Sequence, residues 1–251
     1  MRAARLAVIR GPAFGIPPAP PASAGAEPIR IVDPSGGAIA WIAPGAYAGC
    51  AGFAVRRPDA PADGWLNAFP PGDAPGRWIM PVVLLDEPSA ERAAELDSPE
   101  RPLCWRFAER DPTKVVLDAD GPLGVRLRFA ASLDDARLTL AIEATNEGAD
   151  FVAIGLSLRF RTPPDAQANG PAADGVSIPR GEVVARWRTP DGAVFTIAAV
   201  EGVDSVQFDA APNAIGGPSL TALGFRPAHG LANLPPGGQA RAAASIGTIE
   251  R

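Results

Sequence analysis

The chain contains one histidine, His229, so any acid–base reaction that needs an imidazole depends on that residue. A Ser-His-Asp triad would have to include His229, and no Gly-x-Ser-x-Gly turn marks a partner serine. The phosphate-binding loop, the dinucleotide-binding glycine pattern and the His-Glu-x-x-His helix are also absent from the sequence. A single imidazole cannot build the multi-histidine metal sites of cupin-like proteins. We therefore expect no cofactor and no metal.

A second group of candidate residues lies between residues 63 and 78, in the sequence DGWLNAFPPGDAPGRW. Trp65 and Trp78 offer flat apolar surfaces, and Asn67 and Arg77 offer polar groups, which is the composition of a small-molecule site. The guanidinium fork of Arg77 suits two neighbouring hydroxyls, a carboxylate or a phosphate. Prolines and glycines preset the loop's shape, which favours binding. The alternative is that both tryptophans fill the end of a hydrophobic core, because Trp is usually well buried.

Composition and charge limit the partners of the chain. Its 251 residues carry a formal net charge of −5, and 47% of them are hydrophobic. The acidic balance argues against a nucleic-acid partner, because binding phosphates needs basic patches. No apolar stretch approaches the roughly 18 residues of a membrane-spanning helix, so we expect no membrane partner. The two cysteines, Cys50 and Cys104, are interpreted as small buried hydrophobic residues, with a disulfide between them as the alternative.

The elements that must position these residues are predicted from the alternation of apolar and polar side chains, which half-buried strands require. The clearest runs are 123–129, 138–144 and 152–160, joined by turn-forming residues; we predict an antiparallel meander with one solvent-facing side. Similar short runs occur at 29–33, 38–42, 52–56, 79–85, 104–109, 113–118, 182–188, 193–200 and 240–249. Strands at this spacing predict an all-β sandwich or barrel. One short helix is expected at 89–96, with Ser89 as its cap.

The N-terminal segment differs from the rest of the chain. Residues 1–27 are predicted to be an arm or linker, because the second half of this segment is rich in proline. Residues 28–251 are predicted to be a single β-sandwich domain, since no repeat or break in composition divides them. Arg10 and Pro12 interrupt the apolar run that a signal peptide needs. We therefore expect a cytoplasmic location, with export as the alternative.

Two stretches carry a resemblance to a known family. Residues 176–191, VSIPRGEVVARWRTPD, resemble a segment of isoleucine, proline, threonine, glycine and glutamate that a Gly-Thr-Pro-like turn follows. Residues 228–239, AHGLANLPPGGQ, resemble a Leu-x-Pro-Gly-Glu turn that leads into a last strand, and 31–40 resemble an opening strand pair. The segments that they resemble are those of the galactose mutarotase-like proteins, the family of aldose 1-epimerases. The resemblance extends over residues 29–249 and implies an antiparallel β-supersandwich whose concave face holds a sugar ring.

The departures from this family concern catalysis. Opening and reclosing an aldose ring needs an acid at the ring oxygen and a base at the anomeric hydroxyl, for which the family is understood to use His and Glu. The resemblance places the acid at about 157–164 and the base in 223–227, yet the first stretch has no histidine and the second no carboxylate. His229 and Glu182 are the remaining catalytic candidates; a solvent-facing loop imidazole and a solvated carboxylate at a strand start are the alternatives. The resemblance also places a substrate-binding arginine at Arg77.

We interpret the chain as an all-β, antiparallel β-supersandwich that binds a sugar or sugar derivative, with degraded or absent mutarotase activity. The predicted substrate-binding residues are Trp65, Asn67, Arg77 and Trp78. One alternative is an active aldose 1-epimerase, an isomerase, that uses a non-standard acid/base pair. The other is a non-enzymatic structural or interaction sandwich.

Overall fold

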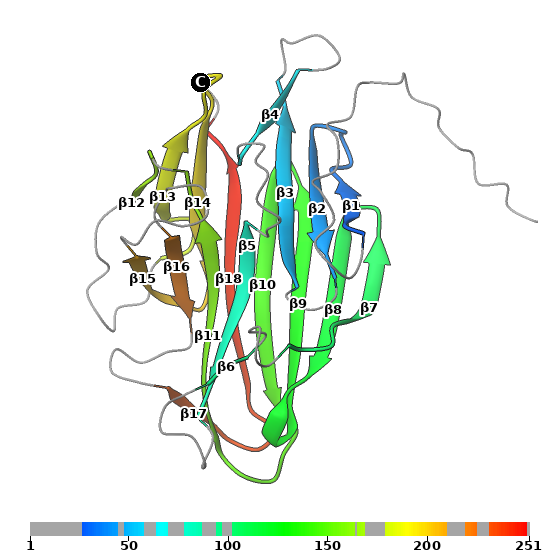
Figure 1. Cartoon of the computed structure of the whole chain (residues 1–251), viewed down its shortest axis with the longest axis vertical. Helices are drawn as coiled ribbons and strands as arrows, with labels where there is room; N and C mark the ends of the chain where they lie inside the picture. Colours follow the sequence, from blue (N-terminus) through cyan, green and yellow to red (C-terminus); the bar gives the residue numbers. More distant parts are fainter. Residues whose placement is uncertain are drawn as a thin grey trace, which may run out of the picture.

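The computed structural model describes residues 27–44, 48–57, 64–69, 78–86, 94–96, 102–163, 165–168, 179–209, 219–224 and 231–249. Within these residues the chain forms strands and one 3₁₀ turn, Pro122–Gly124, but no α-helix. The strands belong to two antiparallel sheets (Figure 1). This confirms the predicted all-β fold. The N-terminal arm proposed for residues 1–27 falls almost entirely outside the described residues and stays a prediction.

The larger sheet has ten strands. They are β1 (Ile29–Val32), β2 (Ala38–Ala43), β3 (Gly49–Arg56), β4 (Trp65–Asn67), β5 (Ile79–Leu85), β6 (Ala94–Leu96), β11 (Val152–Arg161), β15 (Val203–Asp209), β16 (Ser219–Gly224) and β17 (Ala232–Leu234). The main path runs in the order β1–β2–β3–β5–β11–β16–β15. Three short strands join it, because β4 pairs with β3, β6 with β5, and β17 with β11.

The smaller sheet has eight strands. They are β7 (Arg106–Asp111), β8 (Lys114–Asp120), β9 (Val125–Asp134), β10 (Arg137–Asn146), β12 (Gln167–Ala168), β13 (Val183–Arg188), β14 (Val194–Glu201) and β18 (Gln239–Thr248). Their order is β12–β13–β14–β18–β10–β9–β8–β7. Each run of residues predicted to be a strand overlaps a strand of one sheet or the other.

Strand β9 shows how the sequence pattern sets the two faces of the smaller sheet. Leu127 and Phe129 are buried, whereas Arg126 and Arg128 between and beside them are exposed. Both guanidinium groups donate to the Asp118 carboxylate on β8, at 2.8 and 2.9 Å. The hydrogen bond from Arg128, and then that from Arg126, hold the pKa of Asp118 below its usual value despite its partial burial. At β8 and β9 the outer face of the smaller sheet is therefore polar and solvated.

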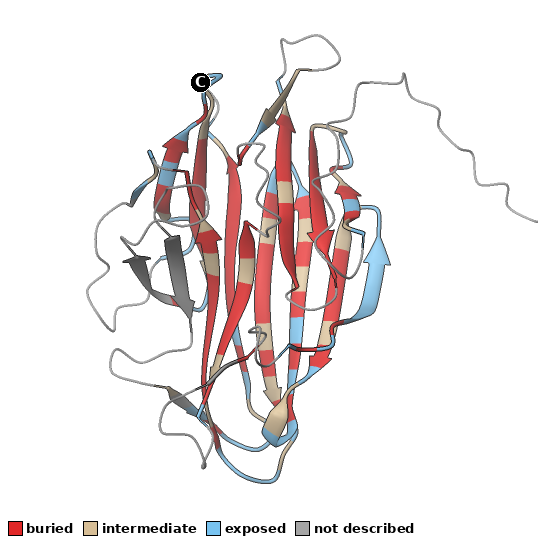
Figure 2. Ribbon diagram, viewed as in Figure 1, coloured by how far each residue is buried: buried red, intermediate tan, exposed pale blue. Residues whose placement is uncertain are grey.

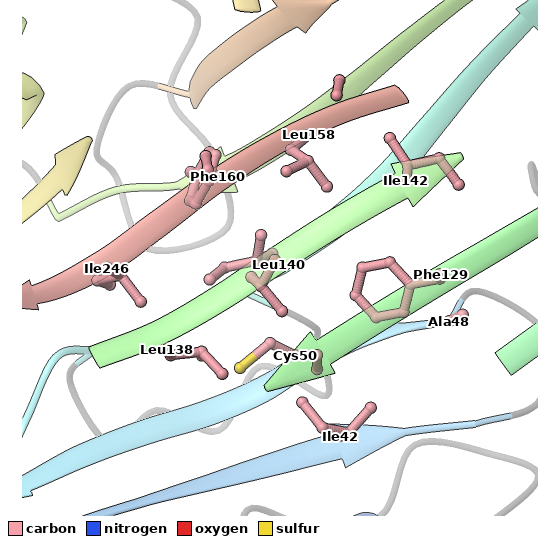
Figure 3. Close-up of a cluster of buried hydrophobic side chains, with 14 of the residues drawn as sticks. Ile42, Ala48, Cys50, Phe129, Leu138, Leu140, Ile142, Leu158, Phe160 and Ile246 are labelled. Atoms are coloured by element: carbon pink, nitrogen blue, oxygen red, sulfur yellow. The ribbon is translucent and has the colours of Figure 1, made fainter. Parts of the chain in front are cut away.

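The core fills the space between the two sheets. Its largest fully buried side chains include Phe53 and Phe160 from the larger sheet and Phe129 and Phe195 from the smaller one. The rings of Phe53 and Phe195 meet edge to face with their centroids 6.1 Å apart, which joins β3 to β14. Figure 2 shows the buried residues running along the central strands of both sheets, and Figure 3 shows a part of this cluster where side chains from both sheets interlock.

The predicted meander is wrong in its third strand. Strands β9 and β10 pair along their whole length, but β11 lies in the other sheet and pairs with β5, β16 and β17. The alternate residues of β11 explain this placement. Gly155 and Ser157 are small and are buried together with the large residues that flank them. A strand with small residues at these positions can be buried on both faces, as a central strand of a covered sheet is.

Two other expectations need correction. Residues 94–96 form β6, which pairs with β5, and Leu96 packs into the core. The helix predicted at 89–96 is therefore wrong for residues 94–96. Residues 89–93 lie outside the described residues. Cys50 is buried and Cys104 is exposed, and both thiols are free. The buried interpretation therefore holds for Cys50 alone. No helix in the described part of the chain has the length and apolarity needed to cross a membrane.

A buried amide joins two connections at one end of the sandwich. Asn146, at the end of β10, is fully buried. Its Nδ2 donates to the main-chain carbonyls of Asp150 and Leu234, at 2.8 and 2.9 Å, and its Oδ1 accepts from the Gly148 N–H at 3.0 Å. All polar atoms of the side chain are thereby satisfied, and the turn after β10 is fixed to β17.

Candidate functional site

The candidate site is the outer face of the larger sheet, where β5 and β11 lie side by side (Figure 1). The residues of β11 that alternate with its core side chains are Ser157, Arg159 and Arg161. Met80 and Val82 of β5 lie opposite Arg159 and Ser157 in the ladder and share this face. The Ser157 hydroxyl donates to the Val82 carbonyl at 3.4 Å. We call this surface the β5–β11 face.

The structure brings together the two stretches in which the resemblance places an acid and a base. Residues 157–161 end β11, and 223–224 end the neighbouring strand β16, with Ser157 directly opposite Leu223. Residues 225–227, the rest of the second stretch, lie outside the described residues. On the β11 side the expected histidine is replaced by a serine and two arginines. The two stretches are thus neighbours in the larger sheet, but their described residues include no histidine and no carboxylate.

Two positive charges lie on one side of β11. Arg159 and Arg161 are two residues apart, which is about 7 Å along a strand. Partial burial lowers the pKa of Arg161, and the neighbouring charge of Arg159 lowers it further. A guanidinium stays protonated in water all the same, because its ordinary pKa exceeds about 12. Within the described residues no carboxylate forms an ion pair with Arg161. The β5–β11 face is thus suited to hydroxyl-rich or anionic ligands.

An apolar cluster covers another part of the same outer face. Its buried members, which are separate from the main core, are Ile39, Trp41, Ala43, Ala51 and Ala54. Trp65 of β4 is half-buried and packs against this cluster, and Asn67, two residues further on the same strand, is exposed. Leu66 between them packs against the main core instead. The structure therefore places Trp65 and Asn67, two of the predicted binding residues, on one face.

Trp78 lies on the other side of the larger sheet. It is 8% exposed and belongs to the main core. Its ring stacks on Phe69 with centroids 5.3 Å apart, and Phe69 stacks in turn on Trp187 of the smaller sheet. The structure thus does not bring Trp65 and Trp78 to one pocket, and the position of Trp78 fits the core alternative. Arg77, the fourth predicted binding residue, lies outside the described residues.

Only one of the two catalytic candidates, Glu182, lies in the described part of the chain. Glu182 is exposed in the turn that precedes β13 of the smaller sheet. Its N–H donates to the Pro179 carbonyl at 3.1 Å, and its carbonyl accepts from the Ala199 N–H at 3.0 Å. It is therefore part of the other sheet and not of the β5–β11 face. His229 lies outside the described residues. Among the residues that are described, no three His, Cys, Asp or Glu side chains gather as metal ligands would.

Sequence reasoning missed Arg159 and Arg161, although the signal was present. In the segment SLRFR, the polar residues alternate with Leu158 and Phe160, which a strand must turn to the core. Both arginines therefore had to share the outer face. Chemically, a guanidinium donates hydrogen bonds but does not exchange protons near neutral pH, so these two residues can bind and orient a ligand but cannot serve as an acid/base pair.

Comparison with known proteins gives a likeness of fold. A candidate aldose 1-epimerase from Escherichia coli K12 matches with a TM-score of 0.61 and 15% identity, over 89% of this chain and 99% of its own. A galactose mutarotase-like protein from Lactobacillus casei matches with a TM-score of 0.60 and 12% identity, over 88% of this chain and 100% of its own. An aldose epimerase homologue from C. elegans matches with a TM-score of 0.55 and 10% identity, over 89% of this chain and 99% of its own.

The sequence comparisons give no match, either to a family model or to a curated protein. At identities of 10–15% the structural matches establish the fold alone. The chain has the galactose mutarotase-like β-sandwich that the resemblance implied.

Proposed function

We propose that this chain, built on the galactose mutarotase-like fold, is a carbohydrate-binding protein with degraded or absent mutarotase activity. One observation carries the proposal. The stretches at which the family's acid and base are expected lie side by side on β11 and β16, and the described part has the half-buried Arg159 and Arg161 there, with Ser157 buried beside them. The fold is mutarotase-like, and hydrogen-bond donors at these two stretches support binding of a sugar rather than its interconversion.

The residue types on the outer face suit a sugar. Guanidinium groups bind neighbouring hydroxyls or a carboxylate through paired N–H donors. A half-buried tryptophan such as Trp65 offers an apolar platform, and the exposed Asn67 amide offers both a donor and an acceptor. Because Arg161 has no ion pair with a described carboxylate, an acidic or phosphorylated sugar gains more from this face than a neutral sugar.

Catalysis needs groups that these arginines do not supply. Ring opening requires proton donation to the ring oxygen and proton removal from the anomeric hydroxyl, and each positioned group contributes about 10²–10⁴ in rate. The outward residues of β5 and β11 include neither an imidazole nor a carboxylate. An active epimerase would have to use a non-standard pair. The position of Glu182 at the start of β13, in the opposite sheet, weighs against its forming such a pair with a sugar on the β5–β11 face.

Calorimetric titration of galactose, galacturonate and galactose 6-phosphate into the purified protein tests the proposal. We expect an acidic sugar to bind, and Arg161→Gln to weaken its binding by about tenfold, which corresponds to about 1.4 kcal/mol. The matched control is Arg186→Gln, because Arg186 is an exposed strand arginine on the smaller sheet. Binding that is equally strong in both variants would place the sugar elsewhere. The absence of binding for all three sugars would favour the interaction-sandwich alternative.

A further inference from the structure

A groove with a volume of about 1060 Å³ hollows one end of the sandwich. Its walls come from both sheets, with the end of β3 and the start of β4 on one side and the β13–β14 hairpin and the end of β18 on the other. In Figure 1 this is the end at which β4 and the C-terminus lie. Leu66 lines the groove and packs against the main core, whereas Trp65 packs against the outer cluster. No described residue of β5 or β11 lines the groove, so the groove is separate from the β5–β11 face.

The charged residues of the groove have a positive excess on an acidic chain. Three arginines, Arg56, Arg57 and Arg188, line it together with two aspartates, Asp135 and Asp191. Among the described residues, neither Arg57 nor Arg188 has an ion pair with a carboxylate. The net charge of the whole chain is −5. Two unpaired guanidinium groups that face one groove are available to an anion.

One of these arginines is held across the groove. Nη2 of Arg57, which follows β3, donates to the main-chain carbonyl of Asp191 in the β13–β14 hairpin at 3.2 Å. This bond connects the two sheets and uses one of the five N–H donors of the guanidinium. The remaining donors stay available while the side chain is already positioned. A positioned donor binds a ligand at a lower entropic cost than a free surface arginine does.

The groove also has an apolar lining. Val55, Leu66 and Val194 contribute to it, and Leu66 continues into the main core. Ile249 lines the groove too and is 51% exposed, which makes it one of the few large apolar side chains that the described chain leaves open to solvent. A ligand that covers Ile249 removes this apolar surface from water. Removing apolar area from water favours the complex.

We propose that this groove is a second ligand site and that it binds an organic carboxylate with an apolar body, such as an aromatic or short aliphatic acid. The planar carboxylate matches the guanidinium fork of Arg57 or Arg188 in a bidentate pair. The apolar body lies on Leu66 and Ile249. A monoanion can pair with one guanidinium of Arg57 or Arg188, whereas a phosphate dianion meets a stronger repulsion from Asp135 and Asp191.

Calorimetric titration with four small probes at low salt tests this site. Benzoate carries both the charge and the apolar body, acetate only the charge, benzyl alcohol only the body, and phenyl phosphate a dianion on the same body. We expect benzoate to bind at least tenfold more tightly than acetate or benzyl alcohol, and phenyl phosphate to bind no more tightly than benzoate. Equal binding of acetate and benzoate would reduce the groove to unspecific ion binding and overturn the proposal. Tighter binding of phenyl phosphate would overturn the preference for a carboxylate.

Variants locate the binding. The double change Arg57→Gln with Arg188→Gln should weaken benzoate at least tenfold, and Ile249→Ser should weaken it as well. Arg186→Gln is the matched control, because Arg186 is also an exposed arginine of β13 but does not line the groove. Arg57→Lys with Arg188→Lys keeps the charge and serves if the glutamine variant does not fold; it should still weaken benzoate, since lysine lacks the planar fork. Benzoate binding that is unchanged in these groove variants would refute the site.

Discussion

Replacing Asn146 by aspartate is the sharpest test of the packing at the end of the sandwich. The two side chains have nearly the same shape, but an ionised carboxylate only accepts hydrogen bonds. In Asn146→Asp the carbonyls of Asp150 and Leu234 would lose their donor and face a negative charge, while the bond from Gly148 could persist. The substitution therefore changes the hydrogen bonds without creating a cavity.

The magnitude follows from the burial of the two carbonyls. The bond to Leu234 is buried, so its carbonyl loses a partner that water does not replace, which costs about 1–3 kcal/mol. The bond to Asp150 is partly buried, and its loss costs about 1 kcal/mol. Together these two terms lower the free energy of unfolding by about 3 kcal/mol in both variants; Asn146→Ala also removes the acceptor of the Gly148 N–H, and Asn146→Asp adds the cost of a buried charge. For a chain of this size, about 3 kcal/mol corresponds to a fall in Tm of about 6–12 °C.

Urea unfolding followed by tryptophan fluorescence measures both variants at pH 7 and at pH 5. The introduced carboxyl has a folded pKa above its unfolded value, because the folded site disfavours the charged form. Its destabilisation should therefore shrink as the pH falls, since the protonated carboxyl can donate one hydrogen bond again. Asn146→Ala is the control, because its deficit should not change between the two pH values. Wild-type stability of Asn146→Asp at pH 7, or a deficit that grows on acidification, would refute the reasoning.

Three further predictions concern single residues. Trp78→Ala should lower the free energy of unfolding by about 3–5 kcal/mol, as large-to-small core changes do. Trp78→Phe should lose less, because it keeps a ring against Phe69. An unchanged urea midpoint in Trp78→Ala would contradict the core position. Burial raises the pKa of Asp33, but hydrogen bonds from neighbouring groups outweigh it and hold the pKa below its usual value. This carboxylate therefore stabilises the fold above its unfolded pKa of about 3.9, and the free energy of unfolding should fall as the pH drops below that value. Asp33→Asn should flatten this pH dependence in urea titrations. A maleimide reagent should label the exposed Cys104 at once and Cys50 only after unfolding, because burial raises the pKa of the Cys50 thiol to about 12, and mass spectrometry of the labelled peptides shows which thiol reacts.

Alternation in the sequence predicted the strands well where one face of a strand meets solvent. Strand β9 alternates buried and exposed residues without interruption, and it was recognised. Strands β15 and β16 were missed. The ladder between them has a register shift between Val203 and Ser205, which disturbs a period of two in β15. The crossing of β11 to the other sheet was missed because pairing partners depend on contacts between distant segments, and the strand's own pattern does not specify them.

The candidate site was only partly predictable for a related reason. Trp65 and Trp78 occur in one short stretch of sequence, but they lie on opposite faces of the larger sheet. Composition identifies aromatic platforms without saying which face they join. The arginines of β11 were accessible through alternation, because Leu158 and Phe160 fix the outward direction of Arg159 and Arg161.

One nuclear magnetic resonance experiment tests the central proposal, that the outer face of the larger sheet binds a sugar without interconverting its anomers. Galacturonate in anomeric equilibrium is mixed with the protein, and saturation transfer from protein to sugar is recorded together with exchange peaks between the α and β anomeric protons. We predict saturation transfer that is strongly reduced in Arg161→Gln, with anomer exchange no faster than in buffer. Exchange accelerated by the wild-type protein would contradict the loss of mutarotase activity, and the absence of saturation transfer would contradict sugar binding.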